Sequence, residues 1–285
     1  MKKWGIWLAF CLLSGCGWLP QASESMADVT TVTHDVSSTH SVATKTIKVS
    51  KDQVNKGSLI LINKNYAIHS GSVEPDIVTL YQHKELLKGF GLLDQTIQLP
   101  QSVVQHFATM VAAAGKDGVN HFLISSGYRS NKEQSKLYQE EGADYALPAG
   151  HSEHNLGLAL DIGSSLKAMN DAPEGEWLQK HAADYGFILR YPKDKTAITG
   201  IQYEPWHFRY VGLPHSVIMQ SQHLTLEEYL DDLKKHKMIQ ATVGGDTYEI
   251  TYNAMKQDAK LQVPANHSYE LSGDNINGVI VTVRL

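Results

Sequence analysis

The segment Ser152-Glu-His154-Asn-Leu-Gly157-Leu-Ala159-Leu-Asp161 decides how the middle of this 285-residue chain folds. It predicts a buried strand, in which side chains point alternately to the two faces. Gly157, Ala159 and Asp161 then share one face, and the two small residues leave space in front of the carboxylate. His154 and Asp161 are both competent zinc ligands. The pattern indicates a metal site with room for a substrate; the simpler alternative is a strand with a solvated Asp161 and an incidental histidine.

A second cluster, Tyr203-Glu204-Pro205-Trp206-His207, supplies a third candidate ligand in His207. On a straight strand Glu204 would lie on the opposite face. Pro205 fixes its own φ and restricts Glu204, so a bend there can aim both side chains into one site. Three protein ligands with an open fourth position are typical of catalytic zinc, and a nearby carboxylate that is not a ligand is the usual base for the attacking water.

A third segment, Ser125-Ser-Gly-Tyr128-Arg129-Ser130, is followed one helical turn later by Gln134. Arg129 lies at the start of a predicted helix, where the backbone dipole also favours anions. A peptidase needs a cation or hydrogen-bond donors beside the oxygen that becomes an oxyanion. The alternative for Arg129 is a surface ion pair, the commoner fate of a single arginine.

Together these segments resemble the signature of the LAS group of zinc peptidases, which includes lysostaphin-like enzymes, D-Ala-D-Ala metallopeptidases and the zinc fold of hedgehog. The motifs are Ser-Gly-Tyr-Arg, Ser-x-His-x-x-Gly-x-Ala-x-Asp and Glu-x-Trp-His, in the order of the family. Within the group the chain is most similar to VanY-type D,D-carboxypeptidases, from about residue 47 to the C-terminus. The resemblance implies an LAS-type domain with a central antiparallel sheet.

The resemblance also implies roles for individual residues. Zinc would be bound by His154, Asp161 and His207. Glu204 would take a proton from water and pass it to the leaving amine, and Arg129 would polarise the scissile carbonyl. The pocket for the terminal D-alanine would be lined by Tyr128, Gln134 and Ser152. The implied reaction removes the terminal D-Ala from peptidoglycan precursors that end in D-Ala-D-Ala, which contributes to glycopeptide (vancomycin) resistance. No serine nucleophile takes part.

Two other interpretations remain open. The enzyme could be an L,D-carboxypeptidase acting on tetrapeptides or a D,D-dipeptidase, because the motifs fix the chemistry but not the neighbouring pocket. A non-catalytic wall-binding module could instead keep the zinc structurally. Glu204 argues against such a module, because a structural site needs no base and would want a fourth ligand. His151 is the only nearby candidate for that ligand, and it fits better as a residue of the rim.

The rest of the pattern favours an α+β fold. Apolar residues from Val103 to Ala114 recur at helical spacing, and Ser130 with Glu133 forms a capping box for a helix that ends at Gly142. Strands and helices follow one another without a regular βαβ rhythm, which argues against a doubly wound sheet. Strands are predicted at residues 58–63, 121–125, 157–162 and 206–211, and a further helix at 177–185.

The composition changes near residue 221, and turn signals then separate β-rich runs. A helical stripe precedes these runs and consists of Leu226, Tyr229, Leu230 and Leu233. We interpret residues 222–285 as a small helix-and-β appendage to a peptidase domain at 47–221. The appendage carries no cluster of chemically active residues, so we expect an accessory or packing role.

The N-terminus resembles a bacterial lipoprotein signal. Lys2 and Lys3 precede the apolar segment 4–13, which is too short to span a bilayer. Leu13-Ser-Gly-Cys16 resembles a lipobox, whose cysteine receives the lipid. Removal of residues 1–15 would leave 285 − 15 = 270 residues with a charge of 23 − 30 = −7. The alternatives are an uncleaved signal anchor or a plain signal peptide.

Residues 16–46 are predicted to form a flexible tether, because eleven of the residues from 21 to 46 are Ser or Thr and few are large and apolar. Lipidated Cys16 would then hold the enzyme on the outer face of the cytoplasmic membrane, in the cell-wall zone. We expect the tether to be dispensable for catalysis.

Composition excludes several other classes of protein. With 42% hydrophobic and 19% charged residues, the chain can bury a core and is not disordered. The net charge of −5 gives no electrostatic support for nucleic-acid binding. Two cysteines, of which cleavage would leave only the lipidated one, exclude a disulfide scaffold.

Overall fold

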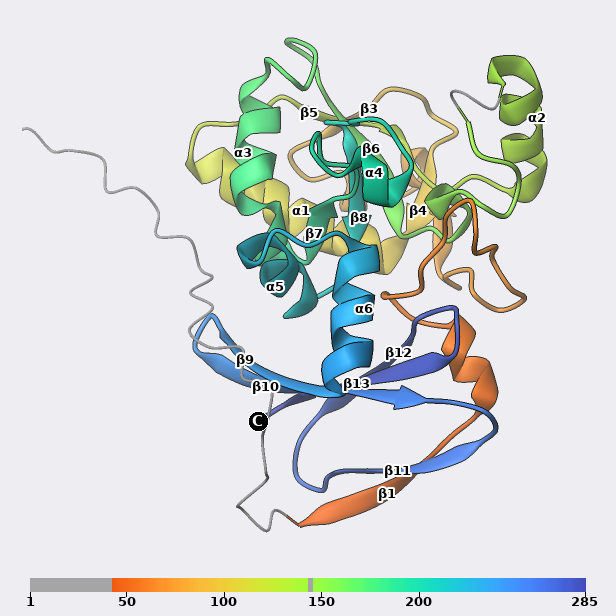
Figure 1. Cartoon of the computed structure of the whole chain (residues 1–285). Helices are drawn as coiled ribbons and strands as arrows, with labels where there is room; N and C mark the ends of the chain where they lie inside the picture. The colour runs from red at the N-terminus through yellow and green to blue at the C-terminus, as the bar shows by residue number, and fades with distance from the viewer. Residues whose placement is uncertain (1–42, 143–145) are drawn as a thin grey trace, which may run out of the picture.

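The computed structural model of the chain describes residues 43–142 and 146–285 (Figure 1). The predicted signal peptide, Cys16 and the predicted tether up to residue 42 lie outside the described residues. Within them, no helix is long and apolar enough to cross a membrane. The helices are α1 (Gln101–Lys116), α2 (Asn131–Glu141), α3 (Pro173–His181), α4 (Thr196–Thr199), α5 (His215–Ser221) and α6 (Leu226–His236). The strands are β1 (Thr44–Val49), β2 (Ile77–Thr79), β3 (Gly91–Leu92), β4 (Gln98–Pro100), β5 (Phe122–Ser126), β6 (Ala159–Ser164), β7 (Phe187–Leu189), β8 (His207–Tyr210), β9 (Met238–Val243), β10 (Asp246–Ala254), β11 (Ala259–Pro264), β12 (Tyr269–Gly273) and β13 (Gly278–Arg284).

The central sheet has the strand order β3-β5-β6-β8-β7. Only the short β3 runs parallel to its neighbour, and the other pairs are antiparallel. This arrangement confirms the predicted α+β fold with a central antiparallel sheet. In this register Asp161 on β6 lies opposite Ser126 on β5 and opposite His207 on β8, so the three predicted motifs meet on neighbouring strands.

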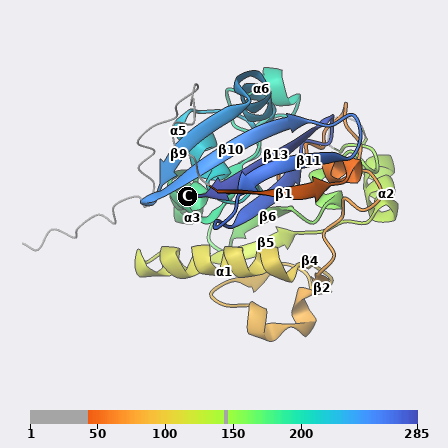
Figure 2. The ribbon, with the colours of Figure 1, turned by 90° about the horizontal axis from the view of Figure 1, so that it is seen from below.

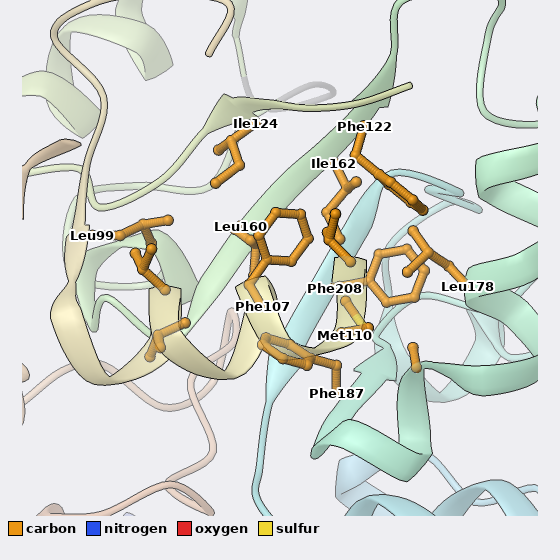
Figure 3. Packing of buried hydrophobic residues seen from close by; sticks show 14 of the residues in the cluster. Leu99, Phe107, Met110, Phe122, Ile124, Leu160, Ile162, Leu178, Phe187 and Phe208 are labelled. Atoms are coloured by element: carbon orange, nitrogen blue, oxygen red, sulfur yellow. The ribbon is translucent and has the colours of Figure 1, made fainter. Parts of the chain in front are cut away.

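The core of the central sheet lies between the sheet and α1 (Figure 3). Phe107 and Met110 point from α1 toward Leu160 and Phe208 on β6 and β8, and all four side chains are completely buried. Burying a side chain of this size contributes about 1.5–3 kcal/mol. The predicted spacing from Val103 to Ala114 is confirmed as the buried face of α1. This packing fixes the strands that carry the site.

The capping box predicted from the sequence begins α2 where expected. Ser130 accepts a hydrogen bond from the backbone of Glu133, whose carboxylate accepts one from the backbone of Ser130, and α2 ends at Gly142. The position of Gly157 differs from the one that the sequence predicts. It precedes β6 with a φ of +84°, and Pro100 fills the space in front of it. Ala159, and not Gly157, therefore provides the small residue on the face of Asp161.

The C-terminal segment forms a second sheet of order β12-β13-β10-β9, with α6 packed on it (Figures 1 and 2). The predicted stripe on α6 is buried. It shares one hydrophobic cluster with residues from the first part of the chain, namely Leu59, Leu61, Ile188 and Val211. Residues 222–285 therefore pack against the peptidase part of the chain through a common core.

Residues 58–63 are not the strand that the sequence predicts. They form a buried loop whose backbone finds other partners: Arg209 donates to the carbonyls of Ser58 and Ile60, and the N–H of Leu61 donates to the carbonyl of Asp274. An apolar run alone cannot distinguish such a loop from a buried strand. The apolar side chains are buried as expected, but their hydrogen bonds go to a side chain and to the β12–β13 turn.

The predicted boundary between tether and domain is also placed too late. β1 begins at Thr44, inside the predicted tether, and pairs antiparallel with β11. The segment Thr44–Val49 alternates polar and apolar residues only from Ile47 onward, so its first half looks like linker. Its pairing partner lies near the other end of the chain, and a local pattern does not reveal such a partner.

Candidate metal centre

Three predicted ligands come together at one end of the central sheet. His154 lies in a short 3₁₀ turn (Glu153–Asn155), Asp161 lies on β6, and His207 opens β8. One ligand atom from each lies within 4.8 Å of the others. Both histidines are buried, and Asp161 is half-buried. No fourth His, Cys, Asp or Glu of the described residues joins this group.

Hydrogen bonds select the nitrogen that each histidine presents. His154 Nδ1 lies 2.7 Å from the carbonyl oxygen of Gly127, so it donates there and leaves Nε2 facing Asp161 Oδ2 at 3.4 Å. His207 turns the other way, with Nδ1 3.0 Å from Asp161 Oδ1. Its Nε2 faces Glu153 Oε2 at 3.5 Å. Two imidazole nitrogens and one carboxylate with fixed orientations are a donor set that fits zinc.

Gly127 has a steric reason to be glycine. A Cβ there would collide with the carbonyl oxygen of Gln98. The N–H of the next residue, Tyr128, donates to that same oxygen at 2.7 Å. The close approach of these two backbone segments places the carbonyl of Gly127 against His154. This contact links the Ser-Gly-Tyr-Arg motif to the predicted ligand.

The electrostatics of the cluster favour a bound cation. Burial alone would raise the pKa of Asp161, but His154 and His207 lower it well below its usual range. Burial alone would lower the pKa of His207, but its contacts with the carboxylates of Asp161 and Glu153 raise it to about 9. Without a metal, a proton on His207 compensates these carboxylates. A divalent cation can replace that proton, because zinc binds neutral imidazole.

Glu204 lies beside the cluster without belonging to it. Its Oε2 is 3.7 Å from His207 Nδ1, and its side chain is 28% exposed. The bend expected around Pro205 is present: residues 205 and 206 form a turn, which the N–H of His207 closes by donating to the carbonyl of Glu204 at 3.2 Å. Burial raises the pKa of Glu204. A raised pKa suits a carboxylate that must accept and release a proton near neutral pH.

Arg129 faces the site from the loop before α2. Its Nη1 donates to Gln134 Oε1 at 2.9 Å and its Nη2 donates to Ser126 Oγ at 3.0 Å. Burial lowers the pKa of Arg129, while the nearby Asp161 carboxylate raises it. Gln134 is buried and also donates to the carbonyl of Leu147 at 2.6 Å. These contacts make Gln134 a support for Arg129, and its predicted place in the pocket lining stays a prediction.

The remaining predicted residues lie around the same cluster. Ser152 is buried directly before the 3₁₀ turn that carries His154. Tyr128 is half-buried between Gly127 and Arg129. His151 directs its Nδ1 to the carbonyl of Asn63 at 2.9 Å and is not part of the metal-binding group. Their roles toward a substrate stay predictions.

A buried ion network next to the cluster is not predicted by any motif of the sequence. Glu153 is completely buried, and its Oε1 accepts hydrogen bonds from Arg190 Nε and Arg209 Nη1, both at 2.8 Å. The two arginines lower the pKa of Glu153 well below its usual range, although burial alone would raise it. The position of Glu153 next to His154 was the one available signal. Its partners are far along the sequence and follow no recognisable spacing.

The sheet and its His–Asp–His cluster are those of an LAS-type metallopeptidase. Residues 96–213 match the VanY family, described as D-alanyl-D-alanine carboxypeptidase. A D-alanyl-D-alanine carboxypeptidase of Enterococcus faecium is 56% identical over 235 residues, which cover 82% of this chain and 78% of that protein. The chain therefore belongs to the VanY family of D-alanyl-D-alanine carboxypeptidases, and it is a hydrolase.

The solved structures that are similar to the chain include the following two. The vancomycin-resistance D,D-dipeptidase VanXYg, solved with a D-Ala-D-Ala phosphinate analogue, has a TM-score of 0.74 at 32% identity and covers 85% of this chain and 100% of its own. A vancomycin-resistance D,D-pentapeptidase VanY from a VanB-type cassette, solved with Zn(II), has a TM-score of 0.50 at 31% identity and covers 61% of this chain and 98% of its own.

Proposed function

We propose that this chain is a zinc-dependent D,D-carboxypeptidase that removes the terminal D-Ala from peptidoglycan precursors ending in D-Ala-D-Ala, and that it contributes to glycopeptide resistance. The observation that carries the proposal is the placement of Glu204. It lies next to a three-ligand group without joining it, as a base should and as a structural ligand should not. The VanY structure that holds Zn(II) supports the choice of metal.

The chemistry follows from the side chains around the cluster. Zinc bound by His154, Asp161 and His207 would supply a Lewis acid that polarises the scissile carbonyl and makes water more acidic. Glu204 takes a proton from the attacking water and delivers it to the leaving amine. The remaining N–H groups of Arg129 donate to the carbonyl oxygen as negative charge grows there.

A D,D-dipeptidase is the second candidate function. The similarity to VanXYg extends over 85% of this chain, and that protein is a D,D-dipeptidase. The two activities share their metal chemistry and differ in how the substrate continues on the amino side of the scissile bond. A longer stem peptide and a free dipeptide therefore distinguish them.

We also propose that Cys16 carries a lipid that holds the enzyme on the outer face of the cytoplasmic membrane. The support for this is the lipobox-like sequence Leu13-Ser-Gly-Cys16 behind a short apolar segment. Replacement of Cys16 by Ala should release the protein from the membrane fraction without changing its kinetics on a soluble peptide. Retention of the variant in that fraction would refute the lipid anchor.

The deciding experiment is mass spectrometry of three substrates incubated with the zinc-loaded protein: a pentapeptide ending in D-Ala-D-Ala, the corresponding tetrapeptide, and free D-Ala-D-Ala. We expect the pentapeptide to lose one alanine fastest. Faster cleavage of the free dipeptide would make the chain a dipeptidase, and cleavage of the tetrapeptide would make it an L,D-carboxypeptidase. No cleavage of any substrate would indicate a wall-binding module.

A further inference from the structure

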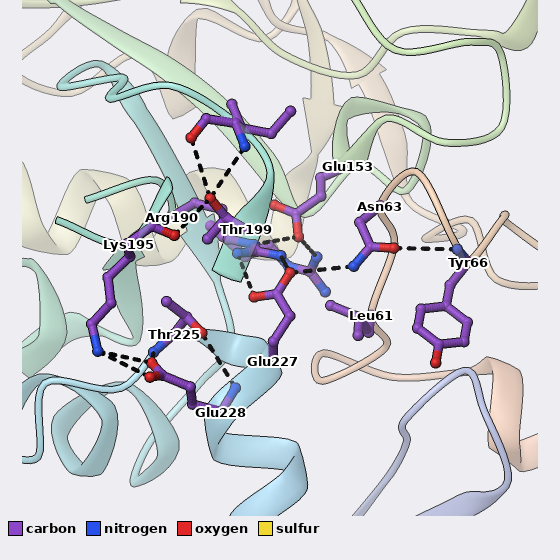
Figure 4. Close-up of polar contacts among 12 residues, drawn as sticks. Leu61, Asn63, Tyr66, Glu153, Arg190, Lys195, Thr199, Thr225, Glu227 and Glu228 are labelled. Atoms are coloured by element: carbon purple, nitrogen blue, oxygen red, sulfur yellow. Dashed lines mark hydrogen bonds and ion pairs between the residues drawn. The ribbon is translucent and has the colours of Figure 1, made fainter. Parts of the chain in front are cut away.

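Glu153 divides its two carboxylate oxygens between different partners. Oε1 accepts from Arg190, as Figure 4 shows, and from Arg209. Oε2 faces only His207 Nε2, at 3.5 Å, and in the described part of the chain neither of these two buried atoms has a hydrogen-bond partner. How the carboxylate of Glu153 is turned therefore decides which charge faces His207 Nε2, while Nδ1 contacts Asp161.

Helix α6 of the C-terminal segment holds Arg190 from the other side (Figure 4). Nη1 and Nη2 of Arg190 donate to Glu227 Oε2 and Oε1 at 2.9 and 2.7 Å, a bidentate pair. Arg190 is completely buried, and the side chain of Glu227 is 14% exposed. Asn63 also donates to Glu227 Oε1, at 3.3 Å. A continuous series of polar contacts thus runs from α6 to the predicted metal ligand.

We propose that Glu227 is a positioning residue for the metal centre. Because it binds both terminal nitrogens of Arg190, only Nε remains for Glu153, and Glu153 Oε2 stays directed at His207. Histidines that bind metals usually direct their other ring nitrogen to such a carboxylate, and loss of the partner weakens metal binding. The inference rests on the proposed function in one respect, that His207 is a zinc ligand.

The charges of the network support this role. Arg190 and Arg209 carry two positive charges, which Glu153 and Glu227 balance. Without the carboxylate of Glu227, Arg190 would share a single buried carboxylate with Arg209, and an uncompensated buried charge is strongly unfavourable. The freed N–H groups of Arg190 would then compete with His207 for Glu153 Oε2.

Helix α6, which carries Glu227, is itself held in place by several contacts. Thr225 and Glu228 form a capping box at the start of α6, and Lys195 donates to Glu228 at 3.0 Å. The buried stripe of the helix packs into the core that it shares with the peptidase part. Glu227 and Glu228 are therefore adjacent carboxylates in one helical turn, but only Glu227 contacts Arg190. Glu228 provides a matched control.

The test compares Glu227→Gln with Glu228→Gln in the full chain. Each variant removes one carboxylate charge, and glutamine at 228 can keep the capping-box bond. The zinc dissociation constant is measured by competition with a chelating dye, and the site geometry by the visible spectrum of the Co(II)-substituted protein. We expect Glu227→Gln to weaken zinc binding about 10-fold, to shift the Co(II) bands and to lower kcat more than it changes KM, while Glu228→Gln stays within about twofold of the wild type.

An unchanged zinc constant and Co(II) spectrum in Glu227→Gln would overturn the proposal, even if the melting temperature falls, because the ion pair would then be merely structural. Should this variant not fold, Glu227→Asp carries the test, since it keeps the charge but retracts it by one methylene. We expect it to weaken zinc binding about threefold, and no change would again overturn the proposal. A wild-type protein that binds zinc but cleaves no peptide would refute the proposed function alone.

Discussion

His207 and His215 are both buried, yet their surroundings favour the protonated form of His207 and the neutral form of His215. His207, in the metal centre, faces the carboxylates of Asp161 and Glu153. His215, the first residue of α5, is buried against α6 and β13, between the hydroxyls of Tyr229 and Thr282 at 2.7 and 3.0 Å. Burial lowers the pKa of both rings, but carboxylate partners raise that of His207 to about 9, while His215, without them, is left at about 3.

The difference shows that the partners of a buried histidine, and not its burial, decide what it can do. A ring beside carboxylates is held where a cation is favourable, and it can exchange its proton for a metal. A ring between hydroxyls stays neutral and links elements of the core. The two regions should therefore respond differently to the same substitution, to metal removal and to pH.

The largest expected contrast is between His207→Ala and His215→Ala. The first variant removes one of three ligands, so zinc affinity should fall by more than the 10–100-fold typical of an outer-shell change, and turnover should be lost. The second leaves two buried hydroxyls without partners and should lower the free energy of unfolding by about 2–5 kcal/mol. It should keep its zinc. Metal analysis and urea unfolding separate the two, and loss of zinc in His215→Ala would break the comparison.

Glu204→Gln sharpens the boundary of the metal centre. Glutamine has nearly the same shape but cannot accept the proton of water, so we expect kcat to fall by about 10²–10⁴-fold with zinc content unchanged. Arg129→Ala should lose about 2.7–4 kcal/mol of transition-state stabilisation by a different route. Turnover of Glu204→Gln within a few-fold of the wild type would contradict the hydrolytic mechanism, and loss of zinc would make Glu204 a ligand.

Leu233→Ala tests the hydrophobic core that α6 shares with the peptidase part, and it removes no polar contact. Leu233 is completely buried on α6, so the cavity should cost about 2–5 kcal/mol of unfolding free energy. Zinc affinity of the folded variant should stay near that of the wild type. Thermal unfolding and chelator competition on the same sample provide the measurement. Unchanged stability would show that this core does not hold the C-terminal segment in place.

The pH dependence of the metal-free protein should have two opposite limbs. The folded-state pKa of His207 is raised from 6.5 to about 9, so its contribution is present below pH 6.5 and is lost as the pH rises through 9. The pKa of His215 is lowered from 6.5 to about 3, so its neutral burial costs nothing above pH 6.5 and becomes unfavourable as the pH falls toward 3. The alkaline limb is worth about 3 kcal/mol and the acid limb about 5 kcal/mol. Urea unfolding with a chelator present should show the alkaline limb in the wild type and not in His207→Ala.

The smallest expected effect follows removal of residues 1–42. A chain that starts at residue 43 keeps every described element, including β1, so its kcat/KM on a soluble pentapeptide should stay within about twofold of the full chain. A chain that starts at residue 50 lacks β1 and leaves β11 without its partner. It should unfold at a lower temperature, and equal melting temperatures for the two chains would contradict the role of β1.

The sequence allowed the parts of the site that lie within short motifs to be predicted. His154 and Asp161 lie in one segment, Glu204 and His207 in another, and the strand alternation and the proline turn between them follow local rules. The contacts of Arg190 with Glu153 and Glu227 could not be predicted, because each partner is 37 positions away and so long a separation follows no helix or strand period. The prediction of a strand at 58–63 is wrong for the same reason. The sequence shows the apolar side chains of this loop, but it does not show its hydrogen-bond partners.

The pairing of β1 with β11 also sets the order in which the chain can fold. The two strands lie side by side (Figure 2). The side chain of Gln262 donates a hydrogen bond to that of Thr46, 216 positions away in the sequence. Closing so long a loop costs entropy before any contact is gained, and non-local strand pairs slow folding. The predicted ligands, all between residues 154 and 207, are synthesised earlier than Glu227 on α6 and earlier than β11, the partner of β1. A nascent or prematurely ended chain can therefore contain the complete ligand set and still lack the contacts that orient it, so a working metal centre reports that the whole chain has folded.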